Sequence, residues 1–130
     1  MPLDGLHESA ERNVVHILVV EDNPADIRLL KEALNGSKLR HELHVTMDGQ
    51  EALDFLHEGS KPTPHLILLD LNLPRKNGHE VLGIIKQDAI LRRIPVIMLS
   101  TSAAASDVGH AYDLHANCFI QKPKSFMFVS

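Results

Sequence analysis

The stretch Val14-Val15-His16-Ile17-Leu18-Val19-Val20-Glu21-Asp22 decides the fold of this chain, because an apolar run ends there in two acidic residues. A second apolar run, His65-Leu66-Ile67-Leu68-Leu69, also ends in an acidic residue, Asp70, and a third, Cys118-Phe119-Ile120-Gln121, ends in Lys122-Pro123. If the three runs are parallel strands of one sheet, their carboxyl ends bring three carboxylates and one ammonium group to one edge. Such an edge is suited to holding a divalent cation and handling phosphate.

The composition predicts a single globular domain. The chain has 130 residues, and its 44% hydrophobic and 23% charged residues are too ordinary a balance for a disordered protein. The net charge of -4 argues against a nucleic-acid partner, which requires clustered Lys and Arg. No apolar stretch approaches the length of a membrane span, so we expect no membrane partner. The one cysteine, Cys118, lies in an apolar run, where a buried thiol is expected.

The two ends of the chain carry separate expectations. Residues 1–13 form a mixed, acidic extension without the features of a signal peptide, so we expect a cytoplasmic protein whose domain spans residues 14–130. After Lys122-Pro123 only residues 124–130 remain, too few for a helix of average length. A doubly wound sheet needs helices on both faces, so we expect the last helix to be short or absent and one face to be partly bare.

Short apolar runs alternate with amphipathic segments, a pattern typical of βα units on a parallel sheet. We expect strands over residues 15–20, 43–47, 66–69, 95–99 and 118–120, and helices after Asn23, after Asp48-Gly49, around Val81–Ile85 and over 104–115. The first helix has a clear start, because Asn23 can cap it, Pro24 suits its first position and Asp26 completes a capping-box-like pair.

The acidic residues predict a metal site. Two carboxylates about 4 Å apart repel by roughly 4 kcal/mol at an effective dielectric constant near 20. Glu21, Asp22 and Asp70 at one edge therefore require compensation, and Mg²⁺ prefers carboxylates, a carbonyl and several waters. Lys122 adds a second positive charge.

A carboxylate beside a divalent cation and a lysine can attack phosphorus and form an aspartyl phosphate. Asp70 is the best candidate nucleophile, because it stands alone at the tip of a central strand, whereas Glu21 and Asp22 are paired for the metal. The hydroxyl groups of Ser100 and Thr101 follow another strand and could hydrogen-bond a phosphoryl oxygen.

Each of these residues also has an ordinary structural explanation. An Asp at a strand end often only forms a turn, a Ser there is an ordinary polar strand end, and Lys-Pro is a common dipeptide. Their joint occurrence, each on its own strand and in order, favours the functional interpretation. His41 and His44 lie near a strand start without a Cys or acidic partner set, so we expect surface residues.

The span from about His16 to Pro123 resembles a response-regulator receiver domain of the chemotaxis-regulator type. The segments that carry the resemblance are Ile17–Asn23, Leu66–Pro74 with Gly78, Ile94–Ser100 and Lys122-Pro123. Leu114–Cys118 and Asn77–Leu82 are similar, more narrowly, to small single-domain regulators that partner bacterial phytochrome histidine kinases.

The resemblance implies a flavodoxin-like, five-stranded parallel sheet in the order 2-1-3-4-5 and a role for each residue of the edge. Asp70 is implied as the phosphoacceptor, which receives the phosphoryl group from a histidine of a sensor kinase. Asp22, Asp70 and the main-chain carbonyl of Asn72 are implied as Mg²⁺ ligands, with Glu21 assisting partly through water. The family usually has an Asp pair where this chain has Glu21-Asp22, a difference that can retune the metal site.

The resemblance also implies a switch. Ser100 is implied as the hydroxyl that follows the phosphoryl group, Phe119 as the aromatic residue that changes rotamer with it, and Lys122 as a contact to the phosphoryl oxygens. The Lys122-Pro123 bond is implied to be cis, which is rare enough to be a sharp expectation. Phosphorylation then shifts the population towards an active form, which is read out on the surface of the fourth helix and fifth strand.

This identification predicts a stand-alone signalling receiver, which is not an enzyme beyond, at most, slow self-dephosphorylation. If one sheet face is bare, a second copy is the simplest partner to bury it. A phosphatase of the haloacid-dehalogenase type needs a second Asp where this chain has Asn72, and a flavin-binding loop would not contain Glu21-Asp22. A docking or dimerisation module of receiver fold that works without phosphorylation remains the alternative.

Overall fold

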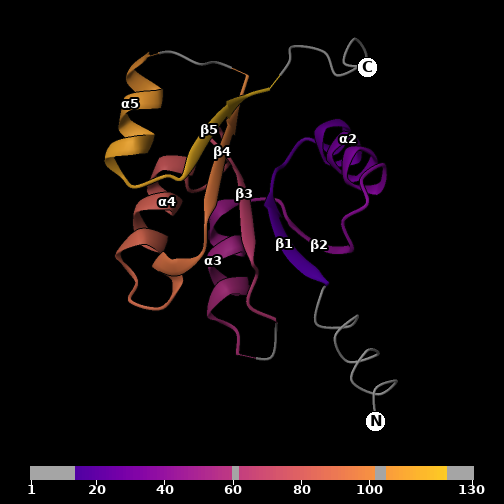
Figure 1. The fold of residues 1–130 in the computed structure, drawn as a ribbon. Helices are drawn as coiled ribbons and strands as arrows, with labels where there is room; N and C mark the ends of the chain where they lie inside the picture. Colours follow the sequence, from indigo (N-terminus) through magenta and orange to yellow (C-terminus); the bar gives the residue numbers. More distant parts are fainter. Residues whose placement is uncertain (1–13, 60–61, 102–104, 123–130) are drawn as a thin grey trace.

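A computed structural model describes residues 14–59, 62–101 and 105–122 (Figure 1). Its elements, in chain order, are β1 (Val15–Val20), α2 (Pro24–Asn35), β2 (His41–Thr46), α3 (Gly49–His57), β3 (Leu66–Asp70), α4 (Gly78–Gln87), the 3₁₀ helix η1 (Leu91–Arg93), β4 (Val96–Ser100), α5 (Ala105–Asp113) and β5 (Cys118–Gln121). All neighbouring strands pair in parallel, in the order β2-β1-β3-β4-β5. The predicted flavodoxin-like fold and its strand order are therefore confirmed.

Helix starts follow the local sequence. The side-chain oxygen of Asn23 accepts hydrogen bonds from the backbone N–H groups of Ala25, at 2.9 Å, and Asp26, at 3.4 Å, and Pro24 occupies the first turn of α2. Asp48 caps α3 and Asn77 caps α4 in the same way. Each cap satisfies donors that a helix leaves free at its start, so the sequence sets these boundaries well.

Two boundaries differ from the prediction by two residues, whereas several strand ends differ by one. β2 begins at His41, not at residue 43, because it pairs with β1 along its whole length, with Val15 opposite His41 and Val20 opposite Thr46. α5 ends at Asp113, before the predicted residue 115, because His115 takes a left-handed backbone conformation with φ of 71°. Such a conformation after a helix turns the chain away from the helix axis.

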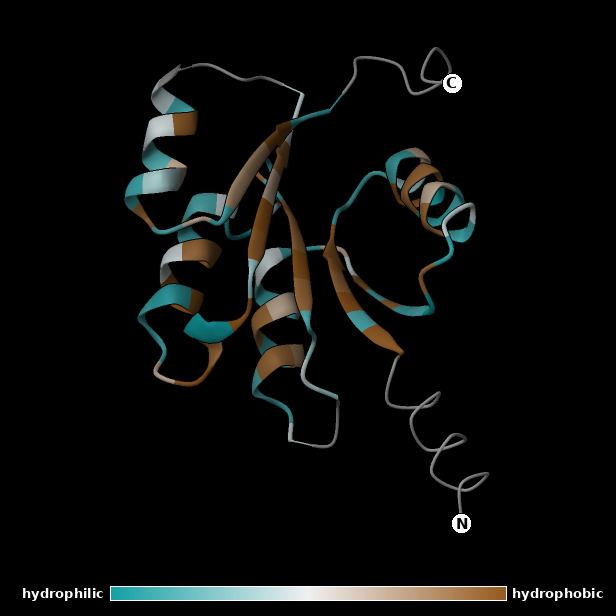
Figure 2. Ribbon diagram, in the orientation of Figure 1, coloured by the Kyte–Doolittle hydropathy of each residue, from teal (hydrophilic) through white to brown (hydrophobic). Residues whose placement is uncertain are grey.

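The hydrophobic core lies between the sheet and the layer formed by α3, α4 and α5 (Figures 1 and 2). Alternate strand residues point into it, and the fully buried members on the sheet include Leu18, Val20, Ile67, Leu69 and Met98. Val81, Leu82 and Ile85 of α4 pack against them and are also fully buried. This packed layer holds the central strands, and hence their carboxyl ends, in place.

The opposite sheet face carries the intervening strand residues. In the described part of the chain, α2 is the one helix on this face (Figure 1), and it has no buried residue. Leu66, Leu68 and Ile97 are half-buried, Cys118 is half-buried instead of buried as predicted, and Ile120 is 46% exposed. Residues 123–130, where we expected a short or absent last helix, lie outside the described residues.

None of the described helices is long and apolar enough to cross a membrane.

Candidate functional site

The candidate site forms where β1 and β3 end side by side. Val20 of β1 pairs with Leu69 of β3, so the next residue of each strand, Glu21 and Asp70, reaches the same edge. Oxygen atoms of Glu21, Asp22 and Asp70 all lie within 4.8 Å of one another. Glu21 and Asp70 are buried, at 1% and 5% exposure, whereas Asp22 is exposed to solvent. The structure thus brings together the three carboxylates that the sequence placed at this edge.

Lys122 lies among these carboxylates. Its backbone N–H donates to the carbonyl oxygen of Ser100 at 2.6 Å, which continues the β4–β5 pairing. Its ammonium group then reaches across the strand ends and donates to Glu21 Oε1 at 2.6 Å. It also forms an ion pair with Asp70 Oδ1 at 3.4 Å. Lys122 is only 6% exposed, so its charge needs these partners.

Asp26 is a residue of this site that the sequence analysis missed. Its carboxylate accepts a hydrogen bond from the Lys122 ammonium group at 2.9 Å. The analysis assigned Asp26 only to the helix cap, and its backbone N–H does bond Asn23. The available signal was its position in the first turn of α2, because a helix that follows β1 directly must start at the same edge of the sheet.

The site holds more negative charge than Lys122 alone can compensate. Burial, together with the hydrogen bond and the charge of Asp70, raises the pKa of Glu21 to about 8, although Lys122 acts to lower it. Burial alone would lower the pKa of Lys122, but its hydrogen bonds to Glu21 and Asp26 and the charge of Asp70 hold that pKa above its ordinary value. Lys122 therefore stays charged, and Glu21 is the group that takes up a proton when no other cation is bound.

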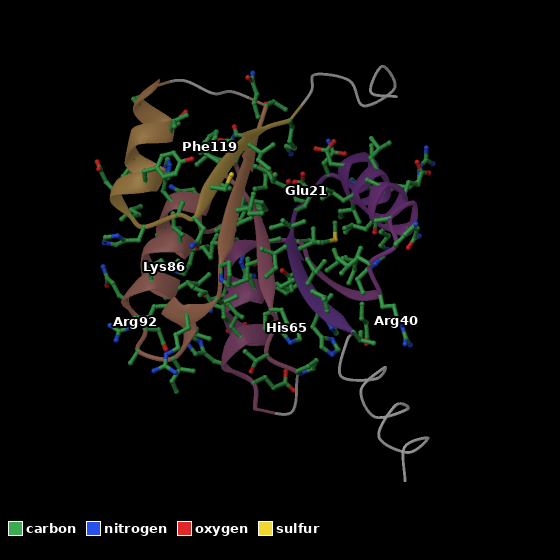
Figure 3. The ribbon with its side chains drawn as sticks, viewed as in Figure 1. Glu21, Arg40, His65, Lys86, Arg92 and Phe119 are labelled. Carbon is green, nitrogen blue, oxygen red and sulfur yellow. The ribbon has the colours of Figure 1, made fainter. Side chains whose placement is uncertain are left out.

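The remaining predicted residues surround this edge. Ser100, the last residue of β4, is fully buried, and Leu99 before it pairs with Asp70. Phe119 of β5 is half-buried and packs against the core (Figure 3). Asn72 is exposed, two residues beyond Asp70. The Lys122-Pro123 bond, expected to be cis, lies outside the described residues.

Gly78 allows the start of α4 to pack closely against the end of β3. Its N–H donates to the carbonyl oxygen of Leu71 at 2.8 Å, so the start of α4 lies directly against the end of β3. A Cβ atom on Gly78 would collide with the carbonyl oxygen of Asp70 and would lie 2.7 Å from Leu71 Cα. Only glycine permits this close approach. The atoms that a Cβ would meet belong to the backbone, so no change of a side-chain rotamer could relieve the clash.

The donor set fits a hard divalent cation. Carboxylate oxygens, one of them solvent-exposed on Asp22, are the ligands that Mg²⁺ and related ions prefer, and the exposed side leaves room for water. A bound cation would also relieve the repulsion that raises the pKa of Glu21.

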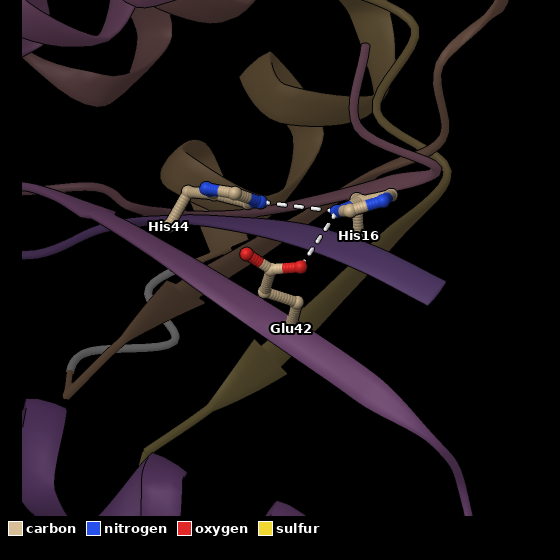
Figure 4. A group of neighbouring side chains, drawn as sticks. All are labelled: His16, Glu42 and His44. Carbon is tan, nitrogen blue, oxygen red and sulfur yellow. Dashed lines mark hydrogen bonds and ion pairs between the residues drawn. The ribbon is translucent and has the colours of Figure 1, made fainter. Parts of the chain in front are cut away.

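A second group of side chains contradicts an expectation from the sequence. His44 lies close to an acidic residue, because the ligand atoms of His16, Glu42 and His44 lie within 4.8 Å of one another on the same face of β1 and β2 (Figure 4). His41 and His44 are half-buried, not plain surface residues. The sequence analysis missed this group because it treated each histidine by itself, whereas the pairing of β1 with β2 brings the three side chains together.

Known proteins share this fold. The family model described as response regulator receiver domain matches residues 17–127. Response regulator Rcp1 from Synechocystis sp. is 49% identical over 113 residues, which are 84% of this chain and 77% of Rcp1. The chain therefore belongs to the response-regulator receiver-domain family.

Solved structures place the chain more narrowly. The Mn²⁺-bound form of Rcp1 superposes with a TM-score of 0.83 and 48% identity, over 87% of this chain and 84% of Rcp1. The phosphorylated cyanobacterial phytochrome response regulator RcpA gives a TM-score of 0.81 and 51% identity, over the same 87% and 84%. The bacteriophytochrome response regulator RtBRR gives a TM-score of 0.75 and 43% identity, over 88% of this chain and 72% of RtBRR. The chain is thus homologous to phytochrome response regulators.

Proposed function

We propose that this protein accepts a phosphoryl group on Asp70 and thereby switches a protein-binding surface. The observation that carries the proposal is the burial of Asp70 and Glu21 around the Lys122 ammonium group, beside the exposed Asp22. Two buried carboxylates and one lysine at a strand end are costly for stability, and nothing in the core requires them. A site that binds a cation and a phosphoryl group gives this arrangement a use.

In the proposed transfer, an Asp70 carboxylate oxygen attacks the phosphorus of a phosphohistidine on a sensor kinase. The new O–P bond forms as the N–P bond breaks, and the histidine nitrogen leaves with its electron pair. Lys122 is already 3.4 Å from Asp70 and is placed to contact the phosphoryl oxygens. Asp22, Asp70 and the Asn72 carbonyl, with Glu21, would hold Mg²⁺, which neutralises charge on the phosphoryl group when bound.

The switch would run from this edge to the surface of α5 and β5. Ser100 lies one residue beyond the Leu99 partner of Asp70, so its hydroxyl is placed to follow a phosphoryl group. Phe119 pairs with Met98 on the neighbouring strand and is only half-buried, which leaves room for a second rotamer. Phosphoryl contacts to Ser100 and Lys122 would then favour the active form of a pre-existing equilibrium.

The proposed partner is a sensor histidine kinase of the phytochrome type. RcpA and RtBRR are named as phytochrome and bacteriophytochrome response regulators, and RcpA has been solved in its phosphorylated form. The Mn²⁺-bound form of Rcp1 supports a divalent cation, for which we propose Mg²⁺ in this chain. We assign residues 14–130 to the receiver domain and residues 1–13 to an extension, and we assign no enzymatic turnover beyond slow self-dephosphorylation.

The alternative is a docking or dimerisation module that does not need phosphate. The half-buried side chains Leu66, Leu68 and Ile97 on the face that α2 covers favour it, because a second copy could bury them. The two functions differ in what Asp70 does, so one experiment separates them.

The test is the intact mass of the protein after incubation with acetyl phosphate and Mg²⁺. We expect one added phosphoryl group on the wild type and none on Asp70→Asn. Asp54→Asn is the matched control, because Asp54 is an exposed aspartate on α3, away from the edge, and this variant should gain the group as the wild type does. A folded wild type without any adduct would refute the proposal and favour the docking module.

A further inference from the structure

The sheet has a second cluster of possible ligands at the end opposite to Asp70. It consists of His16 near the start of β1 and Glu42 and His44 on β2 (Figure 4). Figure 3 shows that the two regions lie at opposite ends of the strands, with Glu21 at one end and His65, a neighbour of His16, at the other. The proposed phosphoryl transfer uses none of these residues.

The strand pairing explains why the three side chains meet. His16 lies opposite Glu42 in the parallel register of β1 and β2, so their side chains point to the same face. His44 is two residues after Glu42 and therefore returns to that face. The two imidazoles and the carboxylate thus converge from two neighbouring strands.

The distances suit a metal ion of the size of Zn²⁺. His16 Nδ1 lies 3.1 Å from His44 Nε2 and 3.7 Å from Glu42 Oε2. The three ligand atoms all lie within 4.8 Å of one another. Ligands at about 2.0–2.1 Å from a tetrahedral zinc are roughly 3.3 Å apart, so small side-chain movements complete the geometry.

The imidazoles are held in position by groups around them. The backbone N–H of His16 donates to His65 Nδ1 at 2.9 Å, and the two rings stack with centroids 5.8 Å apart and an interplanar angle of 16°. The ring of His44 packs against Phe55 of α3 with centroids 5.4 Å apart. The side chain of Glu42 is 60% exposed and that of His16 is 24% exposed, so an ion can reach the cluster from solvent.

We propose that His16, Glu42 and His44 form a binding site for Zn²⁺, with a fourth position open to water. Imidazole nitrogen is a preferred ligand of zinc, whereas the carboxylates at Glu21, Asp22 and Asp70 suit the harder Mg²⁺. The chain would then bind two different cations at the two ends of one sheet. Because the zinc ligands come from β1 and from the outer strand β2, the bound ion would stabilise the pairing of these two strands.

The test is a calorimetric titration of the full chain with Zn²⁺ in excess Mg²⁺, which occupies the acidic edge. We expect one equivalent of Zn²⁺ to bind to the wild type. Loss of an outer-shell partner already weakens metal binding by ~10–100-fold, so His16→Gln and His44→Gln should weaken it at least as much. Glu42→Gln is a milder second variant, because Glu42 is exposed and its replacement should not disturb folding.

The matched control is His41→Gln. His41 is on the same strand, but its Nδ1 bonds the carbonyl oxygen of Leu39 and it is not a member of the cluster. This variant should bind Zn²⁺ as the wild type does. In nitrogen-15 spectra of the imidazoles, Zn²⁺ should shift Nδ1 of His16 and Nε2 of His44 and leave His41 unchanged.

Three results would overturn the proposal. One is the absence of Zn²⁺ binding to a folded wild type in excess Mg²⁺. Another is binding that survives in both His16→Gln and His44→Gln, because the ion would then sit elsewhere, such as the Asp70 edge. The third is imidazole spectra that do not respond to Zn²⁺, because the pair His16–His44 would then be only a hydrogen bond between two rings.

Discussion

The two ends of the sheet hold polar clusters of opposite character. At the carboxyl end, Glu21 and Asp70 are buried around the ammonium group of Lys122. At the amino end, His16 and Glu42 are partly exposed, and the imidazole nitrogens of His16 and His44 are in contact at 3.1 Å. Buried charges depend on one another for stability, whereas partly exposed imidazoles do not. The same strands therefore support a buried site of tightly coupled charges at one end and a more exposed, loosely coupled cluster at the other.

Lys122→Ala is the variant for which we expect the largest change in stability. Removing the ammonium group leaves Glu21, Asp26 and Asp70 without their shared donor, and losing one partner of a buried ion pair costs about 3 kcal/mol or more. We expect this loss of unfolding free energy in urea without divalent cations, and a partial recovery on adding Mg²⁺. The exposed Lys31→Ala is the control and should change stability little. An unchanged stability of Lys122→Ala would mean that the two ends do not differ as described.

Gly78→Ala tests whether the carboxyl end is as rigid as its contacts imply. The added Cβ would meet the backbone of Asp70 and Leu71, which can move only by distorting the end of β3. We expect a loss of about 2 kcal/mol in unfolding free energy, typical of overpacking. Gly109→Ala in α5 is the control, because a Cβ there meets nothing within 4 Å and alanine favours a helix. Equal behaviour of the two variants would contradict the close approach.

We expect a change of pH to have a smaller effect on the free energy of unfolding. Glu21 has a pKa of about 8 in the folded protein, against an ordinary value of 4.5, because of its burial and the neighbouring Asp70 carboxyl. Between these values the folded state holds a proton that the unfolded state has released. This contribution to stability is therefore complete below the ordinary pKa and is lost as pH rises through about 8.

The measurement is the free energy of unfolding at a series of pH values without divalent cations. We expect it to fall with rising pH, by at most about 1.4 kcal/mol per pH unit from this one group. Glu21→Gln is the comparison variant, and it should remove that part of the slope because it cannot titrate. A slope that is the same in both proteins would show that Glu21 does not hold the proton.

Much of the fold and of the acidic edge could be predicted from local patterns. Unbroken apolar runs gave the central strands, and Asn23 with Pro24 marked the start of α2. The order of the runs placed Glu21 and Asp70 at one edge, because parallel strands end on the same side. The end of α5 was less predictable, since His115 takes a left-handed conformation that nothing in the local pattern required.

The sequence by itself determined the layered α/β class and the acidic edge, because both follow from the order and periodicity of neighbouring residues. Only the tertiary structure decided that Asp26 shares the ammonium group of Lys122 and that His16 meets His44. These partners are far apart along the chain, and their meeting depends on how the strands pair and how the side chains cross between elements. Local sequence patterns hold no information about such long-range contacts, which are determined by strand pairing and by packing of the whole domain.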